Sequence, residues 1–301
     1  MNSDITRHFC SSHYRDAAVR LVIRSNKLYF LRKSKPLRRN CLVGVSSDGE
    51  GKRIVLKPDA DGGYNLSVLP HDNQVVSLCS HIPGTGYYSS YIRVPLTIKE
   101  GDVCFHNTPA FICNMDKLKR IATDKVHLQH WLKATNYFQS DEEPIKSIAA
   151  KIAKRCPGDD YLRVLAVHIF VARNLFYDYD ELQAKERQDD SSLAVVKRRH
   201  TTCRGYVSFC VSLLRAMNIP AQELACYLAK PGQMIDAEKV IPRTNHVVVA
   251  TYADSRWMLL DPTRDSHNTY KNGEYYCAIE QPSLANFDMT EQYFSFTHWL
   301  L

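Results

Sequence analysis

The sequence of 301 residues lacks any apolar run near the roughly 20 residues that a membrane-spanning helix needs. Residues 1–20 also lack the apolar segment that defines a secretory signal peptide. These two absences predict a cytoplasmic protein without a membrane span. An export route that uses no such signal is the alternative.

The ten cysteines include no Cys-x-x-Cys pair, so we expect no structural zinc site and no other bound metal. Without a secretory signal, the cysteines should be reduced thiols rather than disulfides. A reducing compartment also suits a catalytic thiol. Most of the cysteines are expected to be packing residues; they stand at positions 10, 41, 79, 104, 113, 156, 203, 210, 226 and 277.

The formal net charge of +7 is spread thinly, with short basic clusters at 33–39, 117–120 and 197–200. No nucleic-acid recognition motif accompanies these clusters, so nucleic acid is not the expected partner. The third cluster lies directly before Cys203. It is either a solvated loop or a source of positive potential that favours a thiolate and an acidic substrate.

The N-terminal part of the chain, from about residue 21 to 107, alternates short β-branched or apolar runs with turn sequences such as Asp59-Ala60-Asp61-Gly62-Gly63. This pattern predicts a small antiparallel β-domain, built as a barrel or a sandwich. A trailing helix is expected over 116–135. We therefore divide the chain into an accessory domain at 1–135 and a second domain at 136–301. The accessory domain could select substrate, shield a site or be purely structural.

Two further helices are expected next, one from a capping box at Ser140 to about Arg155 and one over 161–176. The charged segment 178–200 has no clear periodicity and predicts a surface loop beside a cleft. His127 and His130 share one helix face, but no third ligand lies nearby in the sequence, so a metal site there is not favoured.

Apolar residues recur with helical spacing from Tyr206 to Met217, directly after Cys203. Thr201 and Thr202 precede this helix as candidate caps, and Pro220 marks its end. Cys203 is therefore expected at the helix N-terminus, where unpaired amides and the helix dipole favour an anion. A thiol so placed is a good candidate nucleophile.

A nucleophilic thiol needs a base, and the base needs an orienting group. Two β-rich runs separated by a short polar turn predict an antiparallel hairpin over 245–263. If Tyr252 pairs with Trp257, then Val248 faces Asp261, and His246 and Asp261 become diagonal neighbours roughly 7–8 Å apart. The sequence thus predicts a Cys-His-Asp arrangement.

The Cys-Arg-Gly-Tyr start of the helix, the Asn-His strand and the Trp-x-x-x-Asp-Pro-Thr strand together resemble the transglutaminase-like domain superfamily. The resemblance covers roughly residue 140 to the end of the chain, including 177–180, 286–290 and 295–298. It looks closest to bacterial members that carry an extra N-terminal region. It implies an α+β fold with a transglutaminase-like (papain-like) core, in which the cysteine-bearing helix packs on an antiparallel sheet.

The resemblance also implies roles: Cys203 as the nucleophile, His246 as general base and acid, and Asp261 as the orienting group, without a cofactor. Two departures from the family are Thr201, where glycine is frequent, and Val248, where an aromatic is frequent. Since the hairpin register places Val248 on the triad face, we expect an altered substrate wall or a weakened site.

The implied reaction is cysteine-dependent acyl transfer on protein or peptide amides through a thioester, with hydrolysis favoured over transamidation. The alternative is a catalytically inactive binding module. One oxyanion donor would be the Cys203 N–H, and the second would come from Asn174, Tyr177 or Tyr179. The oligomeric state is not indicated.

Overall fold

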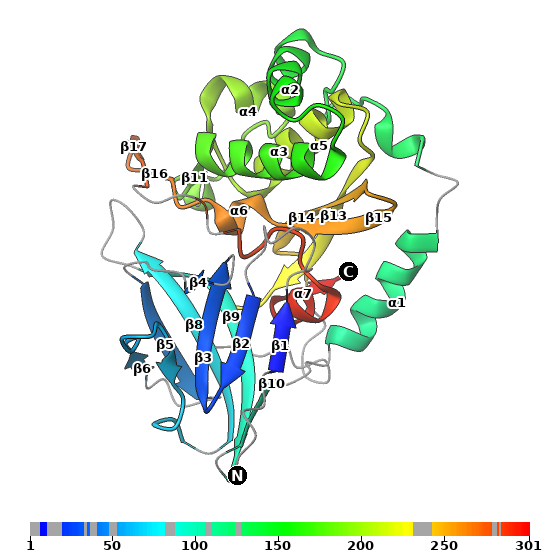
Figure 1. The fold of residues 1–301 in the computed structure, drawn as a ribbon. Helices are drawn as coiled ribbons and strands as arrows, with labels where there is room; N and C mark the ends of the chain where they lie inside the picture. Colours follow the sequence, from blue (N-terminus) through cyan, green and yellow to red (C-terminus); the bar gives the residue numbers. More distant parts are fainter. Residues whose placement is uncertain are drawn as a thin grey trace.

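The structure is a computed structural model of the chain. It describes residues 7–10, 20–32, 35–36, 41–47, 53–70, 72–81, 88–100, 102–105, 110–123, 128–230, 243–278, 282 and 284–301. Antiparallel strands from the N-terminal part form the lower half of the molecule in Figure 1, and helices over a further sheet form the upper half. The expected α+β class is confirmed.

The N-terminal strands form two five-stranded antiparallel sheets. The first has the order β1-β2-β3-β4 with β7 beside β3, and the second has the order β10-β9-β8-β5-β6. Leu21 and Phe30 of the first sheet and Val76 and Leu96 of the second share one apolar core, which favours a sandwich over a barrel. The strands are β1 (Arg7–Cys10), β2 (Arg20–Arg24), β3 (Lys27–Arg32), β4 (Lys35–Pro36), β5 (Cys41–Ser47), β6 (Arg53–Leu56), β7 (Tyr64–Asn65), β8 (Asp72–His81), β9 (Tyr88–Lys99) and β10 (Asp102–Phe105).

The trailing helix differs from the expectation of 116–135. Helix α1 runs over Ala110–Thr123, and a separate 3-10 turn, η3, occupies His130–Leu132. The apolar positions that suggested a longer helix therefore divide between two elements. His130 is exposed on this turn, and His127 lies outside the described residues.

The C-terminal part packs its helices against a four-stranded sheet of order β15-β14-β13-β18. Helix α3 begins where the Asp159 side chain accepts a hydrogen bond from the Leu162 N–H at 3.0 Å. Helix α2 instead begins after Glu142 with Pro144 in its first turn, so the expected Ser140 cap is wrong. The elements are α2 (Glu143–Arg155), α3 (Asp160–Asn174), α4 (Ser192–Arg198), α5 (Cys203–Ala216), α6 (Pro262–Asp265), α7 (Glu291–Thr297), β13 (Ala221–Leu228), β14 (His246–Ala253), β15 (Arg256–Leu260) and β18 (His298–Leu300).

A second, smaller sheet borders the helices, with the order β12-β11-β16-β17. One strand of this sheet lies at the end of the segment 178–200, which was expected to be a loop. The segment also contains two short helices. The members of the sheet and the neighbouring turn are β11 (Phe176–Asp178), η4 (Glu181–Gln183), β12 (His200–Thr201), β16 (Thr269–Lys271) and β17 (Glu274–Tyr276).

Strand β14 is buried on both faces, which explains its nearly continuous apolar sequence. Val247 and Val249 pack into the core beneath helix α5. Val248 and Ala250, which point the other way, join the core of the N-terminal sheets. The central sheet therefore lies between the helices and the N-terminal strands (Figure 1). No helix among the described residues is long and apolar enough to cross a membrane.

Candidate active site

Cys203 is the first residue of α5, as the sequence predicts. The helix buries Tyr206, Phe209, Cys210 and Leu213 against the neighbouring helices and the sheet, while Cys203 itself stays partly exposed. As the first helical residue, Cys203 has an N–H with no acceptor inside the helix. Its thiol thus lies at the positive end of the helix dipole.

The hairpin of β14 and β15 brings His246 and Asp261 together. Tyr252 pairs with Trp257, so the predicted register is confirmed. Pairing ends at Val249 and Leu260, however, so Asp261 does not face Val248 within a ladder. Asp261 instead caps helix α6, accepting from the Arg264 N–H at 3.1 Å, because Pro262 begins a helix there rather than continuing the strand.

His246 Nε2 lies 2.7 Å from Asp261 Oδ2. Because an ionised carboxylate carries no proton, Nε2 must donate this hydrogen bond, and the other ring nitrogen, Nδ1, is left to act as a base. The Cys203 side chain lies close enough to the imidazole to raise the pKa of His246. The three predicted residues therefore form one connected group.

The pKa values of the pair favour the charged forms of both partners. Burial would lower the pKa of His246, but the Asp261 carboxylate and the Cys203 side chain raise it to about 10. Burial would raise the pKa of Asp261, but the charge and hydrogen bond of His246, with smaller contributions from His298, hold it well below its usual range. Asp261 is fully buried, so this charge is stable only with its partners in place.

The structure adds one residue to which the sequence assigned no role. His298, at the start of β18, is fully buried with its Nε2 3.3 Å from Asp261 Oδ2. In the sequence, His298 was noted only as part of the segment 295–298, over which the chain resembles the family. Its contact with Asp261 depends on strand pairing between distant segments, which local sequence patterns do not reveal.

Cys203 and His246 open into a cleft of about 530 Å³. Tyr177 lines it beside the thiol, whereas Asn174 and Tyr179 do not, and the Asn174 amide donates to the Phe170 carbonyl at 2.8 Å. The expectation that Val248 alters the wall is wrong, because Val248 is buried in the core and Val247 lines the cleft instead. The remaining lining residues are Tyr137, Leu182, Arg187, Gln188, Asp189, Asp190, Thr202, Arg204, Thr244 and Asn245.

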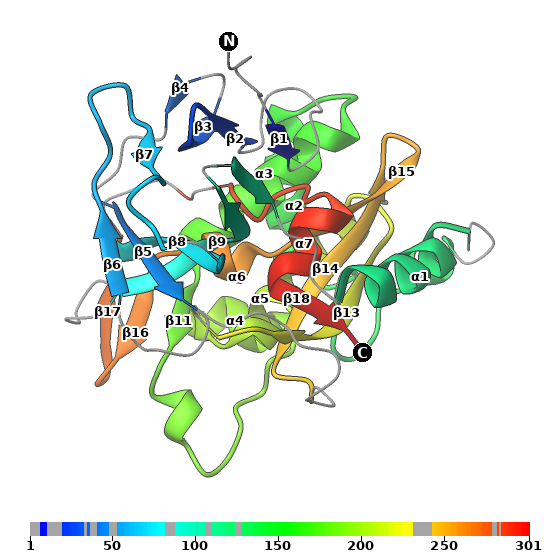
Figure 2. The same cartoon turned by 90° about the horizontal axis from the view of Figure 1, so that it is seen from below.

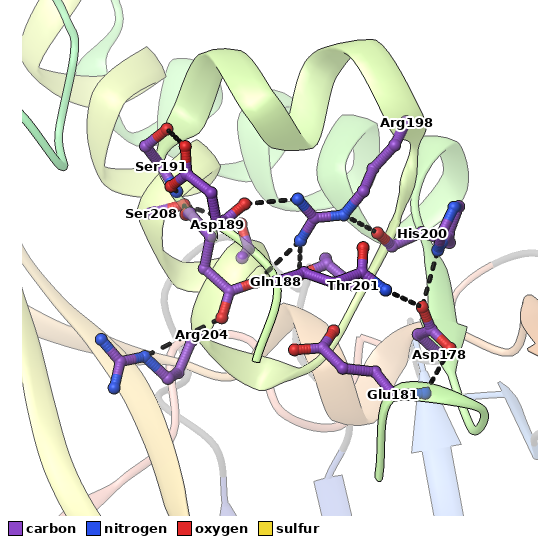
Figure 3. Close-up of polar contacts among 12 residues, drawn as sticks. Asp178, Glu181, Gln188, Asp189, Ser191, Arg198, His200, Thr201, Arg204 and Ser208 are labelled. Carbon is purple, nitrogen blue, oxygen red and sulfur yellow. Dashed lines mark hydrogen bonds and ion pairs between the residues drawn. The ribbon is translucent and has the colours of Figure 1, made fainter. Parts of the chain in front are cut away.

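The buried Asp190 carboxylate lines one wall of the cleft. It belongs to the network of polar contacts around Arg198 and Thr201 that Figure 3 shows. Its Oδ1 accepts from Arg198 at 2.9 Å and from the Thr201 hydroxyl at 2.7 Å. A second carboxylate, Asp178, lies 2.6 Å from His200 Nδ1 and receives Gln188 Nε2 at 3.3 Å. Of the basic cluster before Cys203, Arg198 is therefore neutralised locally by an ion pair rather than directed at the substrate.

Thr201, which replaces the glycine frequent in the family, is fully buried against α5. A Cβ placed on Gly205 would lie 2.0 Å from the Thr201 hydroxyl oxygen. Gly205 is thus required by the packing of Thr201.

His246, Asp261 and His298 form the group of described residues that could converge on a metal ion. The donor set of two imidazoles and one carboxylate suits zinc or iron chemically. In the structure both imidazoles hydrogen-bond the Asp261 carboxylate, and the expectation of no metal stays a prediction.

Comparisons with known proteins give one match to a family model. Residues 146–262 match the family model of the transglutaminase-like superfamily. A search of curated proteins found no match.

The solved structures similar to this chain include three from different organisms. A candidate cysteine protease from Cytophaga hutchinsonii is 21% identical over 48% of this chain and 44% of its own, with a TM-score of 0.37. A candidate protease from Parabacteroides distasonis is 14% identical over 73% and 37%, with a TM-score of 0.31. Red sea bream transglutaminase is 10% identical over 87% and 50%, with a TM-score of 0.33. The matched region thus spans half or less of each of these structures.

Proposed function

We propose that this protein is a cysteine-dependent hydrolase or acyltransferase that acts on protein or peptide amides through a thioester. The observation that carries the proposal is the 2.7 Å hydrogen bond from His246 to Asp261 beside a thiol at a helix N-terminus. Cys203 would be the nucleophile, His246 the base beside it, and Asp261 the group that orients the base, which is the arrangement that nucleophilic catalysis requires.

In the proposed reaction, the Cys203 proton rests on His246 Nδ1, which gives an imidazolium–thiolate pair, and the thiolate attacks the amide carbonyl. The S–C bond forms as the carbonyl electrons move to oxygen. When the tetrahedral intermediate collapses, the C–N bond breaks and His246 returns the proton to the departing amine. Water or a second amine then attacks the thioester while His246 again accepts a proton. Hydrolysis is our first choice and transamidation our second.

The oxyanion would receive two donors. One is the Cys203 N–H at the start of α5. We assign the second to the Tyr177 hydroxyl, since Tyr177 lines the cleft beside the thiol. Burial, with the nearby Cys203 charge, raises the pKa of Tyr177, so the hydroxyl keeps its proton and can donate.

The test is iodoacetamide labelling at pH 6.5, read by peptide mass spectrometry at each cysteine. Cys277, which is exposed, serves as the internal reference for accessibility alone, and Cys210, which is buried, as the unreactive reference. An ordinary thiol with a pKa of about 8.5 is about 1% ionised at this pH. We expect Cys203 to label at least tenfold faster than Cys277, a ratio that His246→Ala abolishes. Equal, slow labelling in both proteins would contradict the proposal and favour the inactive binding module.

A further inference from the structure

The Asp261 carboxylate receives two imidazoles on the same oxygen. His246 Nε2 lies 2.7 Å and His298 Nε2 3.3 Å from Asp261 Oδ2, while Oδ1 accepts from the Arg264 N–H at 3.1 Å. Because the oxygen carries no proton, both ring nitrogens must donate. The orientation of the carboxylate is therefore set from three sides.

His298 is itself held in a single orientation. Its ring stacks on Phe294 with centroids 4.5 Å apart and an interplanar angle of 5°. Its Nδ1 lies 2.7 Å from the Thr297 hydroxyl oxygen and 3.3 Å from the Phe294 carbonyl oxygen. Partners on both ring nitrogens fix the direction in which Nε2 points.

The strand that carries His298 is fixed on both of its edges. One edge pairs with β13, where Leu228 lies opposite His298. The other edge receives the side chain of Asn114 from helix α1, which is fully buried. The Asn114 amide nitrogen donates to the His298 carbonyl at 2.8 Å, and its oxygen accepts from the Leu300 N–H at 2.8 Å. One side chain thus completes the pairing that a neighbouring strand would provide.

Figure 2 shows α1, α7 and β18 side by side at the edge of the central sheet. In addition to Asn114, Lys117 of α1 donates from Nζ to the Leu300 carbonyl at 2.7 Å. The N-terminal region therefore contacts, through α1, the same strand that presents a histidine to Asp261.

We propose that His298 is a positioning residue, which orients the Asp261 carboxylate so that His246 is aligned with Cys203, and that Asn114 of α1 holds His298 in place. This inference rests on the proposed function. It extends the three-residue site to a fourth side chain and links the N-terminal region to the reactivity of the thiol. The hydrogen-bonded partners of metal-ligating histidines typically affect affinity or activity by about 10–100-fold, and we take the lower end of this range as the scale for His298.

The test uses iodoacetamide at pH 6.5 on the full chain, with Cys277 as the internal reference. His298→Phe keeps a ring against Phe294 but removes the donor, and we expect labelling of Cys203 to slow about tenfold. His298→Gln places an amide donor near the position of Nε2 and should restore the rate to within about threefold. Labelling at the wild-type rate in a folded His298→Phe protein would overturn the proposal.

A matched control exists in the second buried histidine–carboxylate pair, His168 with Asp265, joined at 2.9 Å. His168→Phe removes a buried donor of the same kind, whose carboxylate partner Asp265 stands at the opposite end of α6 from Asp261. It should lower the melting temperature while leaving Cys203 labelling within about twofold of wild type. If His168→Phe and His298→Phe slow Cys203 labelling equally, the effect of His298→Phe is explained by general destabilisation, and a positioning role is refuted. Asn114→Ala should slow labelling about threefold, and an unchanged rate would remove α1 from the proposal.

A second readout separates this inference from the proposed function. In ¹H–¹⁵N spectra of histidine-labelled protein, His246 and His298 should each show a ring Nε2–H resonance shifted downfield by the bond to Asp261. His298→Phe should remove one resonance and move the other. If wild-type Cys203 is unreactive but these resonances behave as expected, the proposed function fails and the positioning contact stands. If His298→Phe leaves the His246 resonance unmoved, the positioning role fails whatever the reactivity of Cys203.

Discussion

Replacing Asp261 with asparagine removes one charge from a buried pair and should reverse the protonation of His246. In the wild-type protein, the pKa of His246 is raised from 6.5 to about 10 although burial acts against the charged ring. Asparagine keeps the size of the side chain but loses the negative charge. Burial, which opposes the imidazolium, then dominates, and the pKa of His246 should fall below 6.5.

The magnitude follows from the interval between 6.5 and about 10. At about 1.36 kcal/mol for each pKa unit, the wild-type environment favours the imidazolium by roughly 5 kcal/mol relative to water. Since this figure already includes the penalty of burial, the attraction of Asp261 and Cys203 together must exceed it. Burial is the largest single influence on this pKa and outweighs the charge of Cys203, so removing Asp261 should lower the pKa of His246 by about three units or more.

The assay is a pH titration of the histidine ring nitrogens by ¹⁵N NMR, with His246→Gln used to assign the resonance among the 12 histidines. The wild-type ring should remain doubly protonated through neutral pH, and the Asp261→Asn ring should be neutral at pH 7. Cys203→Ala should give an intermediate pKa, because it removes only the contribution of the thiol. A neutral His246 in the wild-type protein at pH 7, or an unchanged pKa in Asp261→Asn, would refute the reasoning.

Three further predictions concern stability. Because folding raises the pKa of His246, the contribution of this residue to the free energy of unfolding is complete below pH 6.5 and is lost as the pH rises through about 10. The urea midpoint of the wild type relative to His246→Gln should therefore decrease between pH 7 and 11. Gly205→Ala should cost about 1–3 kcal/mol in urea unfolding, because the new Cβ would lie 2.0 Å from the Thr201 hydroxyl oxygen. Adding Thr201→Gly removes this clash and should recover part of the lost stability. If the effects of the two substitutions simply add, this packing is contradicted. Arg198→Met should cost about 3–5 kcal/mol because it leaves the buried Asp190 carboxylate with only the more distant Arg204 cation, 3.9 Å away. A loss below about 1 kcal/mol would show that the pair of Arg198 and Asp190 is solvated.

Local patterns in the sequence were sufficient for the elements that hold the proposed triad. The spacing of apolar residues placed Cys203 at the start of its helix, and the polar turn before Arg256 gave the correct pairing of Tyr252 with Trp257. Both features depend on neighbours within about 15 residues, where periodicity and turn chemistry act directly.

The end of the hairpin shows where such reasoning stopped being reliable. Extending the register beyond Leu260 placed Asp261 opposite Val248, although Pro262 starts a helix instead. His246 and Asp261 are nevertheless close, as predicted, because Asp261 directly follows the last residue of β15 whether it continues the strand or caps α6. The role expected of Val248 did not survive, since the core against which it packs is built from N-terminal strands more than 140 residues away.

His298 and Asn114 were beyond reach for a related reason. Their contact joins segments separated by 184 residues, and the Asn114 side chain acts as a strand neighbour, for which no local pattern exists. Asn114 also lies before the region in which the trailing helix was expected. Contacts of this kind appear only when the sheet is assembled in three dimensions.

The edge of the central sheet closed by Asn114 bears on how the protein can be divided. β18 is the last strand of its sheet, and an unpaired edge strand is a template for pairing with another chain. A fragment beginning at residue 136 would lose the amide that covers this edge, together with the apolar strands that cover Val248 and Ala250. Such a fragment is expected to self-associate through β18. On this reasoning, the N-terminal region also protects the C-terminal part from aggregation, because it covers the edge of the central sheet.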